Sequence, residues 1–185
     1  RNVAAGGANR EVIAYEVDTV QHEKNCLSGK TPNVNFKYGG AQEIDEVDGS
    51  VDVVMLFKSL HHVPIDEMPA ALKEIKRVLK PGGLAYISEP IFAGEFNEVL
   101  RLFHDEQHVR QCAFDAVQKS VNDGVLELVE QVFFHSPVHF ADFEELDTKI
   151  IQATHSEHRL DTSTYKLVKE AFEKHLTAQG ADFLM

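Results

Sequence analysis

The stretch from Val51 to Pro90 constrains the fold more than any other part of the chain. Val51 to Phe57 is almost continuously apolar, which predicts a strand buried on both faces of a parallel sheet. Leu84 to Ser88 is a second short apolar strand. Between them, apolar residues recur at spacings of three and four, as in an amphipathic helix. A strand, a helix and a strand with short connections form a βαβ unit, so this stretch predicts a parallel α/β sheet.

The boundaries of the predicted helix are marked by residues with known preferences. Asp66 is a suitable N-cap, and Pro69 falls in the first turn, where its missing N–H costs little. The sequence from Lys80 to Gly83 is Lys-Pro-Gly-Gly, which predicts the end of the helix. The apolar stripe consists of Met68, Ala71, Leu72, Ile75, Val78 and Leu79.

The segments on either side predict further elements. Strands are expected over Glu11–Glu16 and Val34–Tyr38, with a helix over Thr19–Gly29 between them. Beyond Pro90 the pattern becomes helical, with helices expected over Phe140–Ala153 and Thr162–Gln179 and Gly180 as the C-cap of the latter. Val125–Phe134 fits a strand or a helix. The helical segment 95–153 is too long for a simple crossover, so it is expected to form a lid or an added layer.

Length and composition exclude several classes of protein. The 185 residues suit one domain, and 43% hydrophobic with 26% charged residues is ordinary for a globular protein. A formal charge of −12 disfavours nucleic-acid and anionic-membrane partners. Cys26 and Cys112 are isolated, which argues against a disulfide framework. No apolar run approaches the roughly 20 residues of a membrane span. We therefore expect a cytoplasmic protein.

Candidate site residues lie at the predicted carboxyl ends of strands, where open α/β sheets bind ligands. Glu16 or Asp18 is placed to accept hydrogen bonds from ribose hydroxyls. His61 and His62 follow another strand, and adjacent side chains point in different directions, so one of them at most should face a ligand. That histidine would be a general base or a hydrogen-bonded structural residue. Glu89, after the next strand, is expected to reach the same place.

The histidines also suggest a metal site, but a weak one. His104 and His108 are four residues apart and would share a helix face, and His155 and His158 are three apart. The sequence HDEQH lacks the glutamate position of HExxH, and no third ligand is identifiable. We therefore expect no metal. GxSxG and P-loop patterns are also absent from the sequence.

Taken together, residues 36–90 resemble the class I S-adenosylmethionine-dependent methyltransferases, especially those that methylate small molecules. The resemblance rests on FKYGGAQEI, GSVDVVMLFKSLHHV and LKEIKRVLKPGGLAYISEP, in that order. VIAYEVD fits the second strand of that family, so the resemblance covers about residues 11–90. It implies a Rossmann-like, doubly wound, mostly parallel sheet with helices on both faces and a helical lid.

The resemblance also implies a site for S-adenosylmethionine. By position, Glu16 would bind the ribose and Val17 would pack on the adenine. Gly40, Ala41 and Gln42 would lie along the adenine edge, and Phe57 and Lys58 would line the methionine side. The reaction implied is direct methyl transfer to a small molecule, with His61 or His62 as the base when the acceptor must lose a proton. Segment 95–153 would build the acceptor pocket.

Two departures from the family pattern concern the cofactor site. Gly40 occupies a position where many members have an aspartate. The glycine-rich loop after the first strand is absent from the sequence, and Gly6-Gly7 does not replace it because no strand precedes it. We therefore expect that this first strand lies outside the chain and that the domain is incomplete at both ends.

Two other functions remain open. A nucleotide-dependent oxidoreductase uses a similar sheet, although RVLKPGG favours methyl transfer. A non-catalytic binding or interaction protein would keep the fold without activity, an option motivated by Gly40 and the missing loop. The sequence predicts neither the acceptor nor the oligomeric state.

Overall fold

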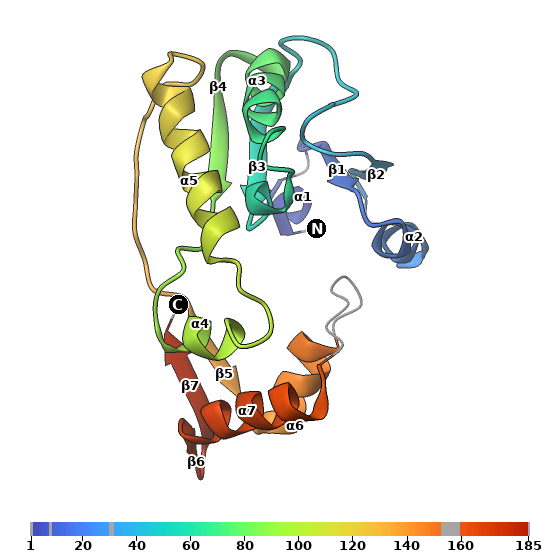
Figure 1. Cartoon of the computed structure of the whole chain (residues 1–185). Helices are drawn as coiled ribbons and strands as arrows, with labels where there is room; N and C mark the ends of the chain where they lie inside the picture. Colours follow the sequence, from blue (N-terminus) through green and yellow to red (C-terminus); the bar gives the residue numbers. More distant parts are fainter. Residues whose placement is uncertain (1, 8, 30–31, 153–159, 185) are drawn as a thin grey trace.

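The computed structural model describes residues 2–7, 9–29, 32–152 and 160–184, and it has an α/β fold with parallel strands, as predicted. In its N-terminal part, α2 packs against a parallel strand pair (Figure 1). The strands are joined in register, with Glu16 opposite Tyr38. The elements of this part are α1 (Asn2–Ala5), β1 (Val12–Glu16), α2 (Thr19–Leu27) and β2 (Val34–Tyr38).

The predicted βαβ unit forms the middle of the chain. It consists of β3 (Val51–Phe57), the 3₁₀ turn η1 (Leu60–His62), α3 (Met68–Val78) and β4 (Leu79–Ser88). β3 and β4 are parallel, and their pairing shifts register between Val51 and Val53. The predicted helix stop, Lys80–Gly83, therefore forms an irregular part of β4 rather than a separate turn. Glu67, not Asp66, precedes the first helical residue, while Pro69 lies in the first turn as predicted.

The C-terminal part combines helices with an antiparallel sheet in the order β5-β7-β6. Figure 1 shows this sheet at the opposite end of the molecule from α3. Its elements are α4 (Glu95–Leu100), α5 (Gln107–Asn122), β5 (Pro137–Phe140), α6 (Phe143–Leu146), the π-helical turn η2 (Asp147–Ile151), α7 (Thr162–Glu173), β6 (Leu176–Thr177) and β7 (Gly180–Leu184).

The buried apolar residues form two separate cores. The first core joins β3, η1, α3 and α5 around Leu60, Leu72 and Ala113. The second core joins α4, β5, α6, α7 and β7 around Phe172 and Phe183. The segment 95–152 is thus divided, because α5 packs in the first core and its other elements pack in the second.

Strand β3 is not buried on both faces, contrary to the prediction. Val53, Met55 and Phe57 are 42, 42 and 57% exposed, whereas Leu56 is 6% exposed. The residues of the first core place α3 and α5 over one face of the β3–β4 pair, and the exposed side chains alternate onto the other face.

The boundaries predicted from the sequence for the two C-terminal helices are wrong. Phe140 pairs with Ala181 in β7 instead of entering a helix, and Asp142 caps a new helix by accepting a hydrogen bond from the Glu145 N–H. The last helix ends at Glu173, and the chain then returns as β6 and β7. Gly180 is a strand residue with φ of 105°, and a Cβ there would lie 2.6 Å from the Phe140 oxygen. It is therefore not a helix C-cap.

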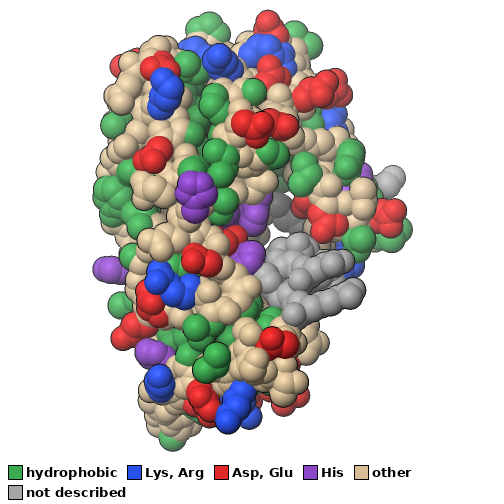
Figure 2. All heavy atoms as spheres, in the orientation of Figure 1, with side chains coloured by type: hydrophobic (Ala, Val, Ile, Leu, Met, Phe, Trp, Pro, Cys, Tyr) green, Lys and Arg blue, Asp and Glu red, His purple; other side chains and the backbone are tan. Residues whose placement is uncertain are grey.

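On the face drawn in Figure 2, the described residues carry apolar, acidic and basic side chains without a large patch of one kind, and several histidines lie near the middle of the molecule. Within the described residues, no helix combines the length and apolar character that a membrane crossing requires.

Candidate functional site

The carboxyl ends of β1 and β2 bring the predicted ribose and adenine residues together. Gly39 donates its N–H to the Glu16 carbonyl at 3.1 Å, which fixes the two strand ends side by side. The half-buried Glu16 carboxylate accepts the Asp18 N–H at 3.0 Å. Asp18 in turn caps α2 by accepting the Gln21 N–H at 3.0 Å. Asp18 is therefore used as a cap, so Glu16 is the acid better placed for a ligand.

The residues around this strand end offer apolar surface and close backbone approach. Val17 is 58% exposed directly beside Glu16, so its side chain is accessible to a flat ring. Gly40, Ala41 and Gln42 are partly buried. A Cβ at residue 40 would lie too close to Gln42 Oε1, so a larger residue there would require only that the flexible Gln42 side chain move. A carboxylate beside accessible apolar surface is chemically suited to a nucleoside, and position 40 contributes no side chain to it.

The carboxyl end of β3 carries the residues predicted to line the methionine side. Phe57 is 57% exposed, and its ring centroid lies 5.3 Å from that of Tyr86 on β4. Lys58 adopts a left-handed conformation with φ of 52°, which is uncommon for a residue other than glycine. Its N–H donates to the Ser88 carbonyl at 2.7 Å, so the chain turns sharply into η1 at the end of the β3–β4 pair.

The Glu89 carboxylate binds the first residues of the η1 turn. Its Oε1 accepts the N–H groups of Ser59 at 3.0 Å and Leu60 at 2.8 Å, and its Oε2 lies 2.5 Å from His61 Nδ1. Burial opposes ionisation of Glu89, but these hydrogen bonds, that of His61 foremost, outweigh burial and lower its pKa. The prediction that Glu89 reaches the same place as the histidine pair is therefore confirmed by contact with His61.

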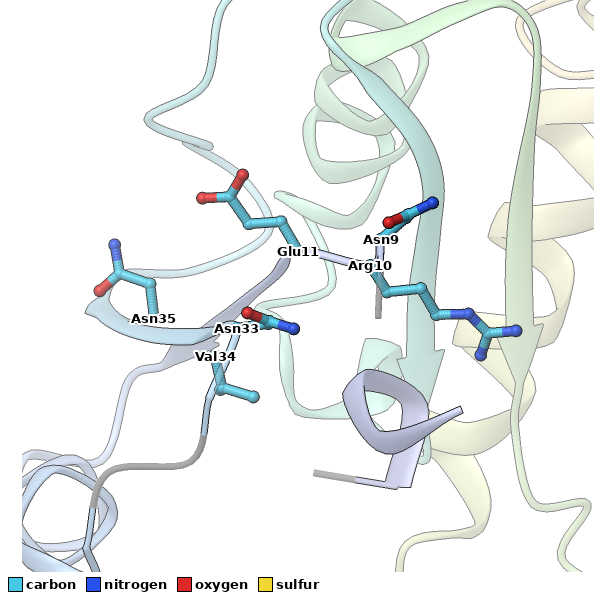
Figure 3. Close-up of a pocket in the computed structure, with 6 residues that line it drawn as sticks. All are labelled: Asn9, Arg10, Glu11, Asn33, Val34 and Asn35. Carbon is cyan, nitrogen blue, oxygen red and sulfur yellow. The ribbon is translucent and has the colours of Figure 1, made fainter. Parts of the chain in front are cut away.

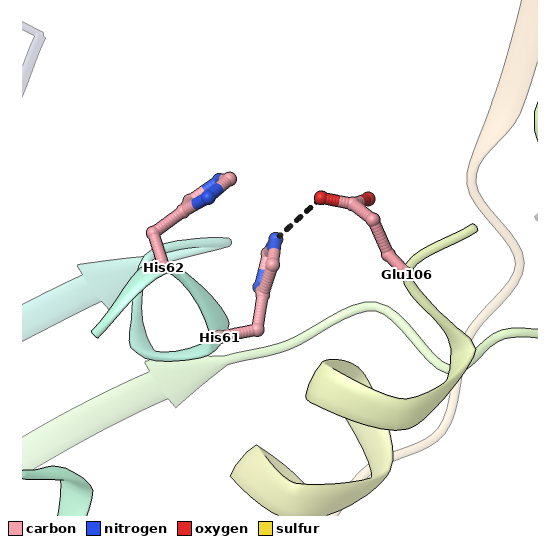
Figure 4. A group of neighbouring side chains, drawn as sticks. All are labelled: His61, His62 and Glu106. Carbon is pink, nitrogen blue, oxygen red and sulfur yellow. Dashed lines mark ion pairs between the residues drawn. The ribbon is translucent and has the colours of Figure 1, made fainter. Parts of the chain in front are cut away.

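The two histidines have different environments, as their adjacency predicts. His61 is 6% exposed and clamped by Glu89, whereas His62 is exposed. Their ring centroids are 4.1 Å apart. Figure 4 shows the two rings leaving η1 and approaching Glu106 from another part of the chain.

Glu106 was not predicted from the sequence as a site residue. It precedes α5, and its Oε1 lies 3.8 Å from His61 Nε2 and 2.9 Å from His104 Nε2. Its Oε2 lies 2.5 Å from Arg110, which also donates to Asn97 Oδ1 at 2.8 Å. Burial opposes ionisation of Glu106, but the charges of Arg110 and the neighbouring histidines, together with the hydrogen bond from Arg110, outweigh burial and lower the pKa of Glu106. The four-residue spacing of Glu106 and Arg110 was the available signal.

The histidine spacing that suggested a metal site, at His104 and His108, does not place the two on one helix. Helix α5 begins at Gln107, so His104 precedes it and shares no helix face with His108. His104 faces Glu106, while His108 lies beside Cys112, with Nε2 3.7 Å from the sulfur. His155 and His158 lie outside the described residues.

A polar pocket of about 360 Å³ lies at the other ends of β1 and β2 (Figure 3). Its lining residues precede or begin these strands and are Asn9, Arg10, Glu11, Asn33, Val34 and Asn35. Ligands of parallel α/β sheets bind at the carboxyl ends instead, so this pocket is not part of the candidate site.

Comparisons with known proteins find methyltransferases among the similar sequences. Residues 1–83 match a protein family described as a methyltransferase domain. An uncharacterised methyltransferase of Schizosaccharomyces pombe is 43% identical over 74 residues, which cover 40% of this chain and 28% of that protein. A probable S-adenosylmethionine-dependent methyltransferase of Mycolicibacterium smegmatis is 34% identical over 83 residues, covering 44% of this chain and 30% of that protein.

A solved structure shares the fold over most of the chain. A putative methyltransferase from Bacillus halodurans superposes with a TM-score of 0.61 at 17% identity, covering 95% of this chain and 79% of that one. The resemblance to class I S-adenosylmethionine-dependent methyltransferases, and with it the Rossmann-like fold, is confirmed. The chain spans under a third of the length of the two sequence relatives named above.

Proposed function

Because residues 1–83 match a methyltransferase domain, we propose that the protein transfers a methyl group from S-adenosylmethionine to a small-molecule acceptor. The observation that carries this proposal is the position of Glu16, beside Gly39 and an exposed Val17 at the end of two parallel strands. A carboxylate and accessible apolar surface at this place suit a ribose and an adenine ring.

Each proposed contact follows from the position of its residue. Glu16 accepts hydrogen bonds from the ribose hydroxyls, Val17 packs on the adenine, and the backbone of Gly40, Ala41 and Gln42 follows the adenine edge. Phe57 and Lys58 line the methionine side. When bound, S-adenosylmethionine supplies a methyl group activated by its sulfonium. The chain contributes mainly alignment and exclusion of water.

The histidine pair is the proposed means of removing a proton from an acceptor. His61 is oriented by Glu89 in the way that a carboxylate orients a catalytic histidine, and exposed His62 lies beside it. Segment 95–153 is proposed to shape the acceptor pocket, since Glu106 already reaches His61 from this segment.

Calorimetry with S-adenosylmethionine and S-adenosylhomocysteine tests the proposal. The Glu16→Ala variant is expected to bind both at least tenfold more weakly, since it loses hydrogen bonds to a charged acceptor worth about 1.5–3 kcal/mol. Glu23→Ala removes the same charge from an exposed position on α2 and is the matched control. It should bind as the unmodified protein does.

Two outcomes would contradict the proposal in different ways. If the unmodified protein does not bind S-adenosylmethionine at millimolar concentration, the proposed cofactor is wrong. If the Glu16→Ala and Glu23→Ala variants bind it with equal affinity, Glu16 is not part of the cofactor site. Binding without formation of S-adenosylhomocysteine, across acceptors bearing hydroxyl, amine or activated carbon groups, would favour the non-catalytic binding protein instead.

A further inference from the structure

Three side chains of metal-ligating type converge at the end of the β3–β4 pair. The ligand atoms of His61, His62 and Glu106 all lie within 4.8 Å of one another. The two histidines come from η1 and the glutamate from the start of α5, so the fold brings the three together (Figure 4). Two imidazoles and a carboxylate form a set that binds zinc and related ions in proteins.

His61 is oriented as metal-bound histidines are. Its Nδ1 lies 2.5 Å from Glu89 Oε2, and Glu89 is itself fixed by two backbone N–H groups. Metal ligands of this kind commonly donate one ring N–H to a carboxylate, which leaves the other nitrogen as the ligand atom. The Nε2 atom of His61 faces Glu106.

Glu106 is also held in position by buried side chains. Arg110 is 6% exposed and binds Glu106 Oε2, and Asn97, which is fully buried, accepts a hydrogen bond from Arg110 at 2.8 Å. The other oxygen, Oε1, lies between His104 Nε2 at 2.9 Å and His61 Nε2 at 3.8 Å, so an ion bound to Glu106 would share this oxygen with His104. Two of the three ligands, His61 and Glu106, are therefore each held by a neighbouring charged side chain, Glu89 and Arg110 respectively.

The distance between the two supported atoms suits a bridging ion. His61 Nε2 and Glu106 Oε1 are 3.8 Å apart, too far for a hydrogen bond. Because Nδ1 contacts Glu89, Nε2 is the His61 nitrogen left to bind an ion in this gap. Zinc–nitrogen and zinc–oxygen bonds are about 2.0–2.2 Å long, so an ion between the two atoms would bond to both at an obtuse angle.

We propose that His61, His62 and Glu106 bind a divalent transition-metal ion, with Zn²⁺ favoured, and that Glu89 and Arg110 position two of the ligands. Three protein ligands leave a coordination position open, as in catalytic rather than structural zinc sites. An acceptor hydroxyl bound there would lose its proton more readily, so with the ion in place the metal would take over the role proposed above for the histidines as a base. This role of the metal rests on the proposed function, whereas metal binding itself does not.

Metal binding is tested on the full chain after treatment with a chelator. The dialysed protein is titrated with Zn²⁺ by calorimetry, and bound zinc is measured by elemental analysis. One equivalent per chain is expected, with affinity at least tenfold lower in His62→Ala and in Glu106→Gln. His62 is exposed, so its replacement should leave the fold intact, which circular dichroism verifies.

His108→Ala is the control variant, because His108 and Cys112 form a second pair able to attract zinc. It should retain the full affinity, and the Co²⁺-loaded protein should lack the charge-transfer absorption of a cobalt–thiolate bond. Absence of zinc in the unmodified protein, unchanged affinity in both site variants, or loss of zinc in His108→Ala would each overturn the proposal. Binding of S-adenosylhomocysteine is measured in parallel in the presence of the chelator. If the protein binds this ligand but no zinc, the metal proposal fails while the proposed function stands.

Discussion

At the scale of single residues, Arg77 ties α3 to the loop that leads into β3. Its guanidinium donates to both carboxylate oxygens of Glu74, to Asp48 Oδ1, and to the backbone carbonyls of Ile44 and Glu46. Arginine suits this position because its planar fork bonds several acceptors at once. Arg77 therefore fixes the loop 44–48 against α3.

Glu74 should make part of the stability of the protein depend on pH. The hydrogen bond from Arg77 lowers the pKa of Glu74 below its ordinary value of 4.5. A lowered pKa stabilises the folded state above the unfolded-state pKa, and this contribution is lost as pH falls through the folded-state pKa. Glu74→Gln should therefore lower the urea midpoint at pH 7, and the difference from the unmodified protein should shrink below about pH 4.5.

Glu130→Gln provides the comparison for this measurement, since Glu130 is exposed and lies outside regular secondary structure. Its urea midpoint should follow that of the unmodified protein at both pH values. A Glu74→Gln deficit of the same size at pH 7 and pH 4 would show that the Arg77 pair does not produce the effect.

At the scale of elements, α3 shows what the sequence could predict. Its apolar positions follow a local rule, and Met68, Ala71, Leu72, Ile75 and Val78 are all buried in the structure. β5 and β7 followed no such rule, because Phe140 becomes a strand residue only by pairing with distant Ala181. Pairing between distant strands cannot be read from local periodicity, which is why the two C-terminal helices were predicted too long.

Truncation of a buried leucine on α3 should destabilise the first core. Leu72 is 1% exposed, so Leu72→Ala is expected to lower the free energy of unfolding by about 2–5 kcal/mol, measured by urea denaturation. Lys73→Ala, at the neighbouring exposed position, should change it by less than about 0.5 kcal/mol. Similar losses in the two variants would contradict the burial of this helix face.

The residues of the candidate site show the same difference between local rules and distant packing. Glu16 and Phe57 end strands, and His61 and Glu89 lie shortly after strands, so the rule that ligands bind at strand ends places all four near a site. Glu106 approaches from a segment whose position depends on packing of α5 against α3 and η1. Its role was therefore not predictable from the sequence.

At the scale of the whole molecule, a mutation that destabilises one of the two cores should leave the stability of the other unchanged. Phe172 is fully buried in the second core, with ring centroids 5.7–6.1 Å from Phe140, Phe143 and Phe183. Phe172→Ala should cost about 3–5 kcal/mol of local stability. Amide hydrogen exchange should accordingly increase in β5, α7 and β7 while α3 and β4 retain their protection.

Leu167→Ala, at a position on α7 that is 56% exposed, controls for loss of an apolar side chain on the same helix. Its exchange pattern should match that of the unmodified protein. An equal loss of protection in α3 and α7 of Phe172→Ala would show that the two cores unfold as one unit.

The βαβ unit also has a consequence for the order of folding. β3, α3 and β4 follow one another within Val51–Ser88, so they meet at a small entropic cost of closing the chain. The antiparallel sheet needs partners far apart along the chain, such as His139 and Asp182, 43 residues from each other. Contacts between near neighbours form fastest. The turn that carries His61 would thus be in place before the second core assembles, and the helices between the two would dock onto a preformed edge.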